Sequence, residues 1–263
     1  MGSEWKVIPV EKSNEKQFLS FLDRDRISHV FTIYDLKYMR DKTRVWAAFK
    51  DHEICGYLFE FDNRIVHTHG TVESVTKLLH CIELDEPVLI IEPDHLAVVK
   101  EFFEPVEPTD ASSKGKITKY LVMKTGANTF NPIIRHRVKR LRTEDVNGVL
   151  EHLGEEWEKR VKDAIHRGIA FGAYEGDLLA SVATVPETID NIAFIRGVYT
   201  APSRRSRGLS TSVVSALVKE IINLGKEAVL WVAEDNLPAK RLYEKIGFQK
   251  TEHIILGFKA RRL

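Results

Sequence analysis

The sequence predicts an α/β protein made of two consecutive units, each with strands and helices around its own sheet. Short apolar runs of strand length alternate with longer segments whose apolar residues recur at helical spacing throughout the 263 residues. A turn-rich segment from Glu104 to Lys116 interrupts this alternation. The order of expected elements is similar on both sides of that segment, which indicates an internal duplication. We therefore expect one domain at residues 1–125 and a second at residues 126–263.

In the first unit, strands are expected where apolar residues alternate, and helices where they recur every three or four residues. Pro93 falls at the first position of a helix, where its missing N–H costs no hydrogen bond. The expected helices are Glu15–Leu22, Ile33–Met39, Val72–Ile82 and Pro93–Phe103, and the expected strands are Val45–Lys50, Gly56–Phe61, Arg64–His69, Pro87–Ile91 and Ile117–Lys124.

The second unit carries stronger local signals. The sequence Glu175-Gly176-Asp177 predicts a tight hairpin, and Gly225 is a natural end for the long helix before it. Thr143 suits the N-cap of the first helix. The expected helices are Thr143–Leu153, Glu155–His166, Gly208–Leu224 and Pro238–Ile246, and the expected strands are Val138–Leu141, Ile169–Tyr174, Leu178–Val185, Ile192–Thr200, Ala228–Val232 and Ile254–Lys259.

Bulk composition excludes several classes of partner. The chain has 39 basic and 38 acidic side chains, a net charge of +1, so no global field favours nucleic acid or an anionic membrane. No apolar run approaches the roughly 18 residues of a membrane span. Cys55 and Cys81 lack the spacing of a metal or redox motif, and we expect two reduced, buried thiols in a cytoplasmic protein.

A loop with three arginines joins an expected strand to the long helix. Arg204, Arg205 and Arg207 follow the strand Ile192–Thr200, and Gly208 opens the helix. A helix N-terminus presents unpaired N–H groups and a partial positive charge, and arginine adds forked hydrogen bonds, so this arrangement suits a pyrophosphate. Taken alone, these residues fit a solvated basic loop equally well.

A second motif follows the next expected strand. It has the spacing Asn-x-x-Ala-x-x-x-Tyr-x-x-x-Gly-Phe and is matched by Asn236, Ala239, Tyr243, Gly247 and Phe248. Together with the loop Arg205-Ser206-Arg207-Gly208-Leu209-Ser210, it resembles the GNAT superfamily of N-acetyltransferases, especially its FR47-like and glycine-acyltransferase-like branch. There the loop reads Arg/Gln-x-x-Gly-x-Gly/Ala, so Ser210 departs from the pattern while remaining small. The resemblance covers roughly the last half of the chain.

The resemblance implies the GNAT fold, a central mixed and mostly antiparallel sheet flanked by helices, here in two tandem GNAT-like units. It also implies acetyl-CoA, or another short acyl-CoA, as co-substrate. The backbone of one strand would pair with the pantetheine arm, the following loop would hold the pyrophosphate, and an asparagine would hydrogen-bond the arm. These cofactor-binding residues are Val198, Tyr199 and Thr200, then Arg205, Ser206, Arg207, Gly208, Leu209, Ser210 and Thr211, and finally Asn236.

The same resemblance assigns Tyr243 as the general acid that protonates the departing thiolate. A phenol with a pKa of about 10 is protonated at neutral pH and can donate to a thiolate whose pKa is about 8.5. A tyrosine on the inner face of a short helix could also be an ordinary core residue. The complete motif around Tyr243 favours the catalytic interpretation.

The general base is absent from the positions where relatives often carry a glutamate. Those positions are Phe194 and Trp231 here, and both are apolar. The nearby carboxylates Glu187, Asp190, Glu234 and Asp235 are each expected to be solvated loop residues. Deprotonation through water and backbone carbonyls is the remaining route.

The first unit is expected to be a degenerate repeat without a cofactor site. Its strand Arg64–His69 runs through Gly70 and Thr71 directly into a helix, with no arginine loop between them. His67 and His69 could share a strand face and, with His52, offer nitrogen ligands. No cysteine or carboxylate cluster completes that set, so a polar strand end is preferred and no metal is expected.

The expected function is therefore transfer of an acyl group from acyl-CoA to a primary amine, by direct attack of the amine on the thioester. The acceptor would be a small molecule, an amino acid or a peptide or protein amine, because the segments expected to form its cleft carry no recognisable motif. A catalytically weak sensor of the same fold, which binds CoA or an acylated amine, is the alternative. Neither the acyl chain length nor the oligomeric state follows from the sequence.

Overall fold

The computed structural model describes residues 4–107, 117–146 and 155–263. By its internal contacts the chain forms two compact units, the first made of Met1–Leu121 with His253–Leu263 and the second of Val122–Glu252. The contiguous division expected after residue 125 differs from this arrangement, because the last strand of the chain completes the sheet of the first unit. Most of the expected loop before residue 117, and the end of the helix expected to reach Leu153, lie outside the described residues.

The first unit contains the elements expected from the sequence together with two short strands near its ends. In chain order its helices and strands are β1 (Trp5–Pro9), α1 (Glu15–Leu22), α2 (Val30–Tyr38), β2 (Thr43–Lys50), β3 (Glu53–Phe61), β4 (Ile65–Gly70), α3 (Val72–Leu78), β5 (Val88–Ile91), α4 (Leu96–Val99), β6 (Phe103–Pro105) and the start of β7 (Thr118–Thr125), and the end of β13 (Gln249–Arg262) returns to it.

The sheet of the first unit has the order β1-β2-β3-β4-β5-β13. Pairing is antiparallel except between β4 and β5, which run parallel. The sheet is thus mixed and mostly antiparallel, as predicted. The helix expected over Pro93–Phe103 is shorter, because α4 ends at Val99 and Phe103 pairs with Arg262 of β13 in β6. That pairing joins segments far apart in the sequence, and no local pattern indicates it.

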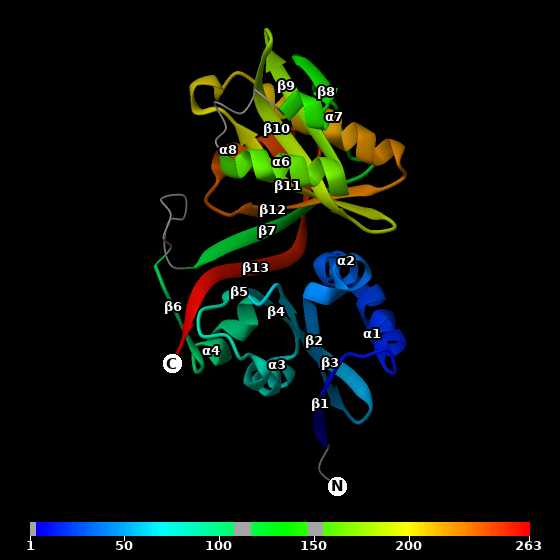
Figure 1. Cartoon of the computed structure of the whole chain (residues 1–263), viewed down its shortest axis with the longest axis vertical. Helices are drawn as coiled ribbons and strands as arrows, with labels where there is room; N and C mark the ends of the chain where they lie inside the picture. Colours follow the sequence, from blue (N-terminus) through cyan, green and yellow to red (C-terminus); the bar gives the residue numbers. More distant parts are fainter. Residues whose placement is uncertain (1–3, 108–116, 147–154) are drawn as a thin grey trace. The chain divides into compact units, whose positions relative to one another are not determined.

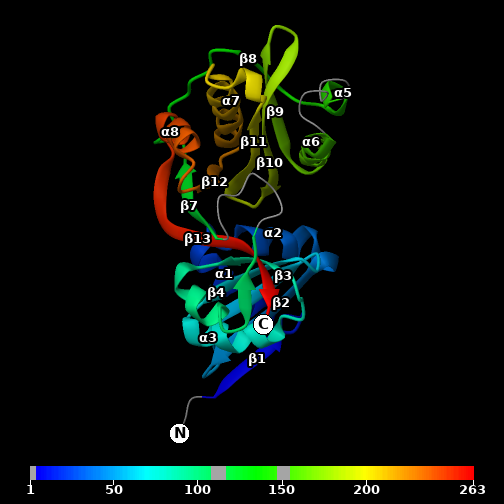
Figure 2. The ribbon, with the colours of Figure 1, turned by 90° about the vertical axis from the view of Figure 1, so that its left-hand side faces the viewer.

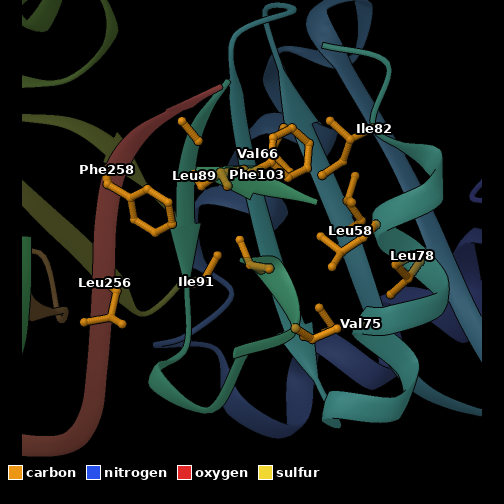
Figure 3. Close-up of a cluster of buried hydrophobic side chains, with 14 of the residues drawn as sticks. Leu58, Val66, Val75, Leu78, Ile82, Leu89, Ile91, Phe103, Leu256 and Phe258 are labelled. Atoms are coloured by element: carbon orange, nitrogen blue, oxygen red, sulfur yellow. The ribbon is translucent and has the colours of Figure 1, made fainter. Parts of the chain in front are cut away.

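Each face of this sheet carries its own apolar core, because side chains alternate between the faces of a strand. Phe18 of α1 and Leu36 of α2 pack with Tyr57 on one face, and the helices α1 and α2 lie on that side (Figure 1). On the other face Leu78 of α3 packs with Leu58. Figure 3 shows that Leu256 and Phe258 of β13 point into this second cluster.

The second unit contains the remaining elements. They are the end of β7, β8 (Arg137–Arg140), α5 (Thr143–Val146), α6 (Glu155–Arg167), β9 (Ile169–Glu175), β10 (Leu178–Thr188), β11 (Ile192–Thr200), α7 (Leu209–Asn223), β12 (Glu227–Ala233), α8 (Leu237–Lys245) and the start of β13. The strand order is β7-β12-β11-β10-β9-β8, and β11 and β12 form a parallel pair within a mostly antiparallel sheet.

Helices cover both faces of the second sheet. Figure 2 shows α7 and α8 on one side of β9, β10 and β11, and α5 and α6 on the other. The buried residues of α7 include Val214, Leu217 and Ile221, which recur at the helical spacing that the sequence predicts. On the opposite face Val161 and Ala164 of α6 pack with Val182. The sheet that contains β11 and β12 is therefore packed against helices on both of its faces.

Membrane-spanning helices and the state of the two cysteines were also addressed by the sequence. Among the helices in the described residues, none is long and apolar enough to cross a membrane. Cys55 and Cys81 are free thiols and are half-buried, not fully buried as expected.

Phe258→Ala is expected to destabilise the first unit by about 3–5 kcal/mol, because the change leaves a cavity where β13 closes the core. Lys259→Ala, at the next position of β13, is the matched control. The Lys259 side chain pairs with Glu86 at the surface, 2.7 Å away, and such pairs contribute about 0–1 kcal/mol. Urea unfolding followed by circular dichroism measures both. Equal midpoints for the two variants would show that β13 does not support this core.

Candidate active site

The loop between β11 and α7 forms an exposed helix N-terminus. A 3₁₀ turn at Pro202–Arg204 is followed by Ser206, with φ of 62°, and by Gly208, with φ of 83°. This left-handed backbone at two nearby positions turns successive N–H groups towards one side and favours glycine at the second position. Leu209, 1% exposed, anchors the start of the helix in the core.

The first turn of α7 has amide groups without partners inside the helix. The first backbone hydrogen bond of the helix runs from the Ser212 N–H to the Gly208 carbonyl, 3.0 Å. The N–H groups of Leu209, Ser210 and Thr211 precede it and lie where a helix supplies no acceptor. Gly208, the N-cap residue, has no side chain to cap them. The sequence prediction of an anion site therefore falls on a helix end with open donors.

Glu175, at the end of β9, holds two of the three arginines of this loop. Its carboxylate accepts hydrogen bonds from Arg207 Nη1 at 3.0 and 3.2 Å and pairs with Arg204. The hydrogen bond from Arg207, ahead of that from Arg204, lowers the pKa of the Glu175 carboxyl. Sequence reasoning placed Glu175 only in a hairpin. Glu175 and Arg204 are 29 residues apart in the sequence, so no local signal links this carboxylate to the arginine loop.

His136 adds a further contact to the same loop. Its Nε2 lies 2.9 Å from the carbonyl oxygen of Arg207, and a Cβ on Gly208 would be 3.7 Å from that nitrogen. His136 directly precedes β8, and no motif links it to the loop. The N-terminus of α7 is thus positioned by the hairpin carboxylate and by this imidazole.

The strands β11 and β12 pair only at their beginnings. Their parallel register covers Ile192 with Glu227, Ala193 with Ala228 and Phe194 with Val229. Both strands continue beyond this register, β11 to Thr200 and β12 to Ala233. The edge of β11 after Phe194 is therefore separated from β12, and this is where the sequence predicts pairing with an extended ligand.

The other edge of β11 is firmly held by β10. Val182 pairs with Tyr199 and Ser181 with Thr200. The Ser181 hydroxyl donates to the Tyr199 carbonyl at 2.8 Å. The Thr200 carbonyl accepts from Arg205 Nε at 3.2 Å, so one of the backbone groups predicted to contact the ligand arm is already engaged.

Asn236 is the N-cap of α8. Its Oδ1 accepts a hydrogen bond from the Ala239 N–H, 3.2 Å. Pro238 falls in the first turn of the helix, where a proline is tolerated. The side-chain oxygen of Asn236 is therefore used by the helix, and the remaining group with which it can contact a ligand is its NH₂.

Gly247 and Phe248 in the same motif have structural roles. Gly247 has φ of 99°, and a Cβ there would lie 1.9 Å from the carbonyl oxygen of Thr129. The backbone of residues 126–131 passes over this glycine, and the Asn131 N–H donates to the Ile246 carbonyl at 3.0 Å. Phe248 packs against the ring of Tyr243, with centroids 5.6 Å apart. These contacts fix the end of α8 and with it the tyrosine.

Tyr243 is 7% exposed. Burial raises the pKa of its phenol to about 12. Within the described part of the chain no side chain or backbone group hydrogen-bonds its hydroxyl. The phenol is therefore protonated at any physiological pH, and its proton is not committed to a described neighbour.

Phe194 and Trp231 stand where relatives often carry the glutamate base. Their rings pack edge to face, with centroids 5.6 Å apart. Of the nearby carboxylates, Asp190, Glu234 and Asp235 are exposed, as expected. Glu187 is not a loop residue: it lies in β10 and is only 4% exposed. The expectation for Glu187 was wrong because β10 extends three residues beyond the predicted end at Val185.

The equivalent region of the first unit has neither an open strand pair nor an open helix end. Pairing between β4 and β5 continues to Thr68 and Ile91, the end of β5. The Thr71 side chain caps α3 by accepting from the Ser74 N–H, 3.2 Å. Among the described residues, no group of three or more histidine, cysteine or acidic side chains is arranged to hold a metal ion.

The second unit thus combines a diverging parallel strand pair with an arginine-lined helix N-terminus, which defines an α/β protein suited to a phosphorylated, extended ligand. Residues 170–255, which contain these elements, match the FR47-like protein family. Among curated proteins, none matches the sequence significantly.

Solved structures share the fold over nearly the whole chain. A Drosophila protein has a TM-score of 0.67 at 13% identity and covers 96% of this chain and 98% of its own. An acetyltransferase of the GNAT family from Colwellia psychrerythraea has a TM-score of 0.58 at 14% identity, covering 97% and 99%. A tandem GNAT protein from the clavulanic acid biosynthesis pathway has a TM-score of 0.57 at 12% identity, covering 98% of both chains.

The matched segment belongs to a part of the chain whose fold is shared with solved acetyltransferases of the GNAT family. The predicted fold class, a mixed and mostly antiparallel sheet flanked by helices in tandem units, is confirmed.

Glu175→Gln is expected to speed trypsin cleavage after Arg204 and Arg207 several-fold, because both arginines lose the carboxylate that holds the loop. Asp177→Asn is the control on the same hairpin, since Asp177 pairs with Arg137 at 3.4 Å instead. Mass spectrometry of timed digests identifies the cleaved bonds. Identical cleavage rates in the wild type and both variants would mean that Glu175 does not order the loop.

Proposed function

We propose that the protein is an acyl-CoA-dependent N-acyltransferase that transfers an acetyl or other short acyl group to a primary amine. The observation that carries the proposal is the juxtaposition in the chain of a diverging strand edge on β11 and the open N-terminus of α7 directly after it. An acyl-CoA has a thioester-bearing arm that can add to a strand edge and a pyrophosphate that suits a helix N-terminus.

The proposed binding site for acyl-CoA consists of backbone and side-chain groups of β11, the arginine loop, α7 and α8. The N–H groups from Ser206 to Thr211, with the Arg205 side chain nearby, would hold the pyrophosphate. The free edge of β11 at Val198 and Tyr199 would pair with the pantetheine arm. Asn236 would donate from its NH₂, because its oxygen caps α8. Thr200, the third strand residue of the sequence prediction, is left out of this proposal because its carbonyl already accepts a hydrogen bond from Arg205.

The chemistry is direct attack of a neutral amine on the thioester carbonyl. The new C–N bond forms, the C–S bond breaks, and the sulfur leaves as a thiolate that needs a proton or a hydrogen bond. Tyr243 supplies that group in the proposal. Because its pKa of about 12 lies above the roughly 8.5 of a thiol, the phenol hydrogen-bonds the sulfur and passes its proton only as negative charge develops there.

The first unit is proposed to have lost its cofactor site. Continuous pairing of β4 with β5 and the capped end of α3 support this proposal, because both features remove groups that the second unit leaves open. We propose a supporting role for this unit in substrate binding.

A sensor that binds acyl-CoA without turnover is the second candidate, and the apolar Phe194 and Trp231 favour it. Release of free thiol from acetyl-CoA in the presence of a panel of amines separates the two. A sensor would be stabilised against heat by CoA but would release no thiol.

Tyr243→Phe is expected to lower kcat for thiol release about 100-fold, a typical loss for a missing proton donor. Tyr174→Phe is the control, because Tyr174 is a similarly buried tyrosine of the same unit, 6% exposed. The wild-type rate should not fall on the alkaline side through Tyr243 below about pH 11, since a raised phenol pKa keeps the proton in place. Equal rates for Tyr243→Phe and wild type would remove Tyr243 from the mechanism.

A further inference from the structure

We propose that Glu187 is the general base that accepts the proton of the acceptor amine. It lies on β10, whereas Phe194 and Trp231, the usual positions of the base, lie on β11 and β12. The inference rests on the proposed function. It starts from the register of the sheet, because Glu187 of β10 stands directly opposite Phe194 of β11. Opposite residues of an antiparallel pair project from the same face with Cβ atoms about 5 Å apart. A carboxylate on β10 can therefore lie close to the position at which a base on β11 would stand, where this chain has Phe194.

A bulge in β10 determines which face Glu187 occupies. Thr184 pairs with Arg196 and Glu187 with Phe194, so two residues of β10, Val185 and Pro186, oppose a single residue of β11. The extra residue inverts the alternation, and Pro186 suits a bulge because it has no N–H to pair. Without the bulge the carboxylate would project from the other face.

The carboxylate faces α6. The charges that act on it come from Arg196 on β11 and from Arg167 and Asp163 on α6. This is the face on which α5 and α6 lie (Figure 2). The same face carries Phe194, and the pairing of β11 with β12 ends at that residue. Glu187 is thus one strand away from the start of the diverging edge.

One oxygen of Glu187 is committed and the other is not. Oε1 accepts from Arg196 Nη1 at 3.0 Å. Oε2 is buried, and no group of the described residues hydrogen-bonds it. A buried acceptor without a hydrogen bond is unfavourable, and more so when it is charged. Oε2 is therefore the oxygen of Glu187 that is open to a proton.

The electrostatic environment suits a base. Burial raises the pKa of Glu187, while the charge of Arg196, followed by that of Arg167, opposes the rise and Asp163 adds to it. A raised carboxyl pKa brings the group closer to neutral pH, where a base is most effective. Arg196, whose side chain is 55% exposed, keeps the carboxylate from being held permanently protonated.

The proton balance of the reaction is complete with these groups. The acceptor ammonium passes one proton through a single water to Glu187 Oε2, which leaves a neutral amine. Its nitrogen attacks the thioester carbonyl, the C–S bond breaks, and Tyr243 gives its proton to the departing thiolate. The second proton that the nitrogen loses as the amide forms returns to the Tyr243 oxygen, and Glu187 passes its own proton to solvent. The products are the amide, CoA thiol and one released proton.

The test is the pH dependence of thiol release by the full chain with the Glu187→Gln substitution. We expect kcat/KM to fall about 100-fold at pH 7, because glutamine keeps the hydrogen bond with Arg196 but accepts no proton. The deficit should narrow steadily towards pH 10, where solution supplies the neutral amine without help. A deficit of equal size at every pH, or none, would overturn the role of Glu187.

Glu220→Gln is the matched control, because Glu220 forms a comparable glutamate–arginine pair with Arg140 at 3.2 Å in the same unit. It should follow the wild-type profile. Absence of thiol release from the wild type with every amine would reject the proposed function itself, whereas an active wild type with an unaffected Glu187→Gln rejects only the base.

Thermal unfolding gives a readout besides activity. A group with a raised pKa in the folded state loses stabilising free energy as pH rises through that pKa. Glu187→Gln should therefore raise Tm relative to wild type at pH 8 and lose that advantage at pH 4.5. A lower Tm for Glu187→Gln at both pH values would assign Glu187 to a structural ion pair and contradict the proposal.

Discussion

The early end of pairing between β11 and β12 is the constraint on which the candidate site depends. Parallel strands in the interior of a sheet normally satisfy their backbone groups with each other. Here the register stops at Phe194 and Val229 although both strands continue. The outer half of β11 is held from one side by β10, and its other edge does not pair with β12. The loop after it turns through Ser206 and Gly208 into α7, so the unpaired strand edge is followed directly in the chain by the helix N-terminus.

The two units show how one order of elements can give different local chemistry. In the first unit β4 and β5 stay paired, Thr71 caps the next helix, and the chain passes directly from strand to helix. In the second unit the strands separate, a loop with arginines intervenes, and the helix end is uncapped. These differences involve few residues and do not disturb the sheets, because each sheet is stabilised by its own apolar clusters. Two units with a similar order of elements can therefore differ at one strand pair and one helix end while each sheet keeps its own core.

Local sequence patterns predicted most of the fold, and the candidate site is proposed from two local motifs. The helix α1 and the strand β11 have the predicted bounds, and α7 differs by one residue at each end, because helical spacing, strand alternation and end signals are encoded within a few residues. The motif around Tyr243 was also local. The long-range features were not predictable: β13 completes the sheet of the first unit, Glu175 reaches the arginine loop, and a bulge turns Glu187 towards α6. Each depends on which strands become neighbours, and a single sequence does not encode that in any short pattern.

Direct calorimetric titration of CoA into the protein tests the central claim, that the N-terminus of α7 is an anion site. The decisive variants are Gly208→Glu and Gly225→Glu, because both glycines have positive φ, 83° and 73°, and only the first lies at that N-terminus. Both substitutions carry similar backbone strain, but only at Gly208 does the new carboxylate oppose the pyrophosphate. The account predicts that Gly208→Glu weakens CoA binding at least about tenfold, equivalent to ~1.4 kcal/mol, while Gly225→Glu binds as wild type does. Unchanged CoA affinity in a folded Gly208→Glu variant would contradict it.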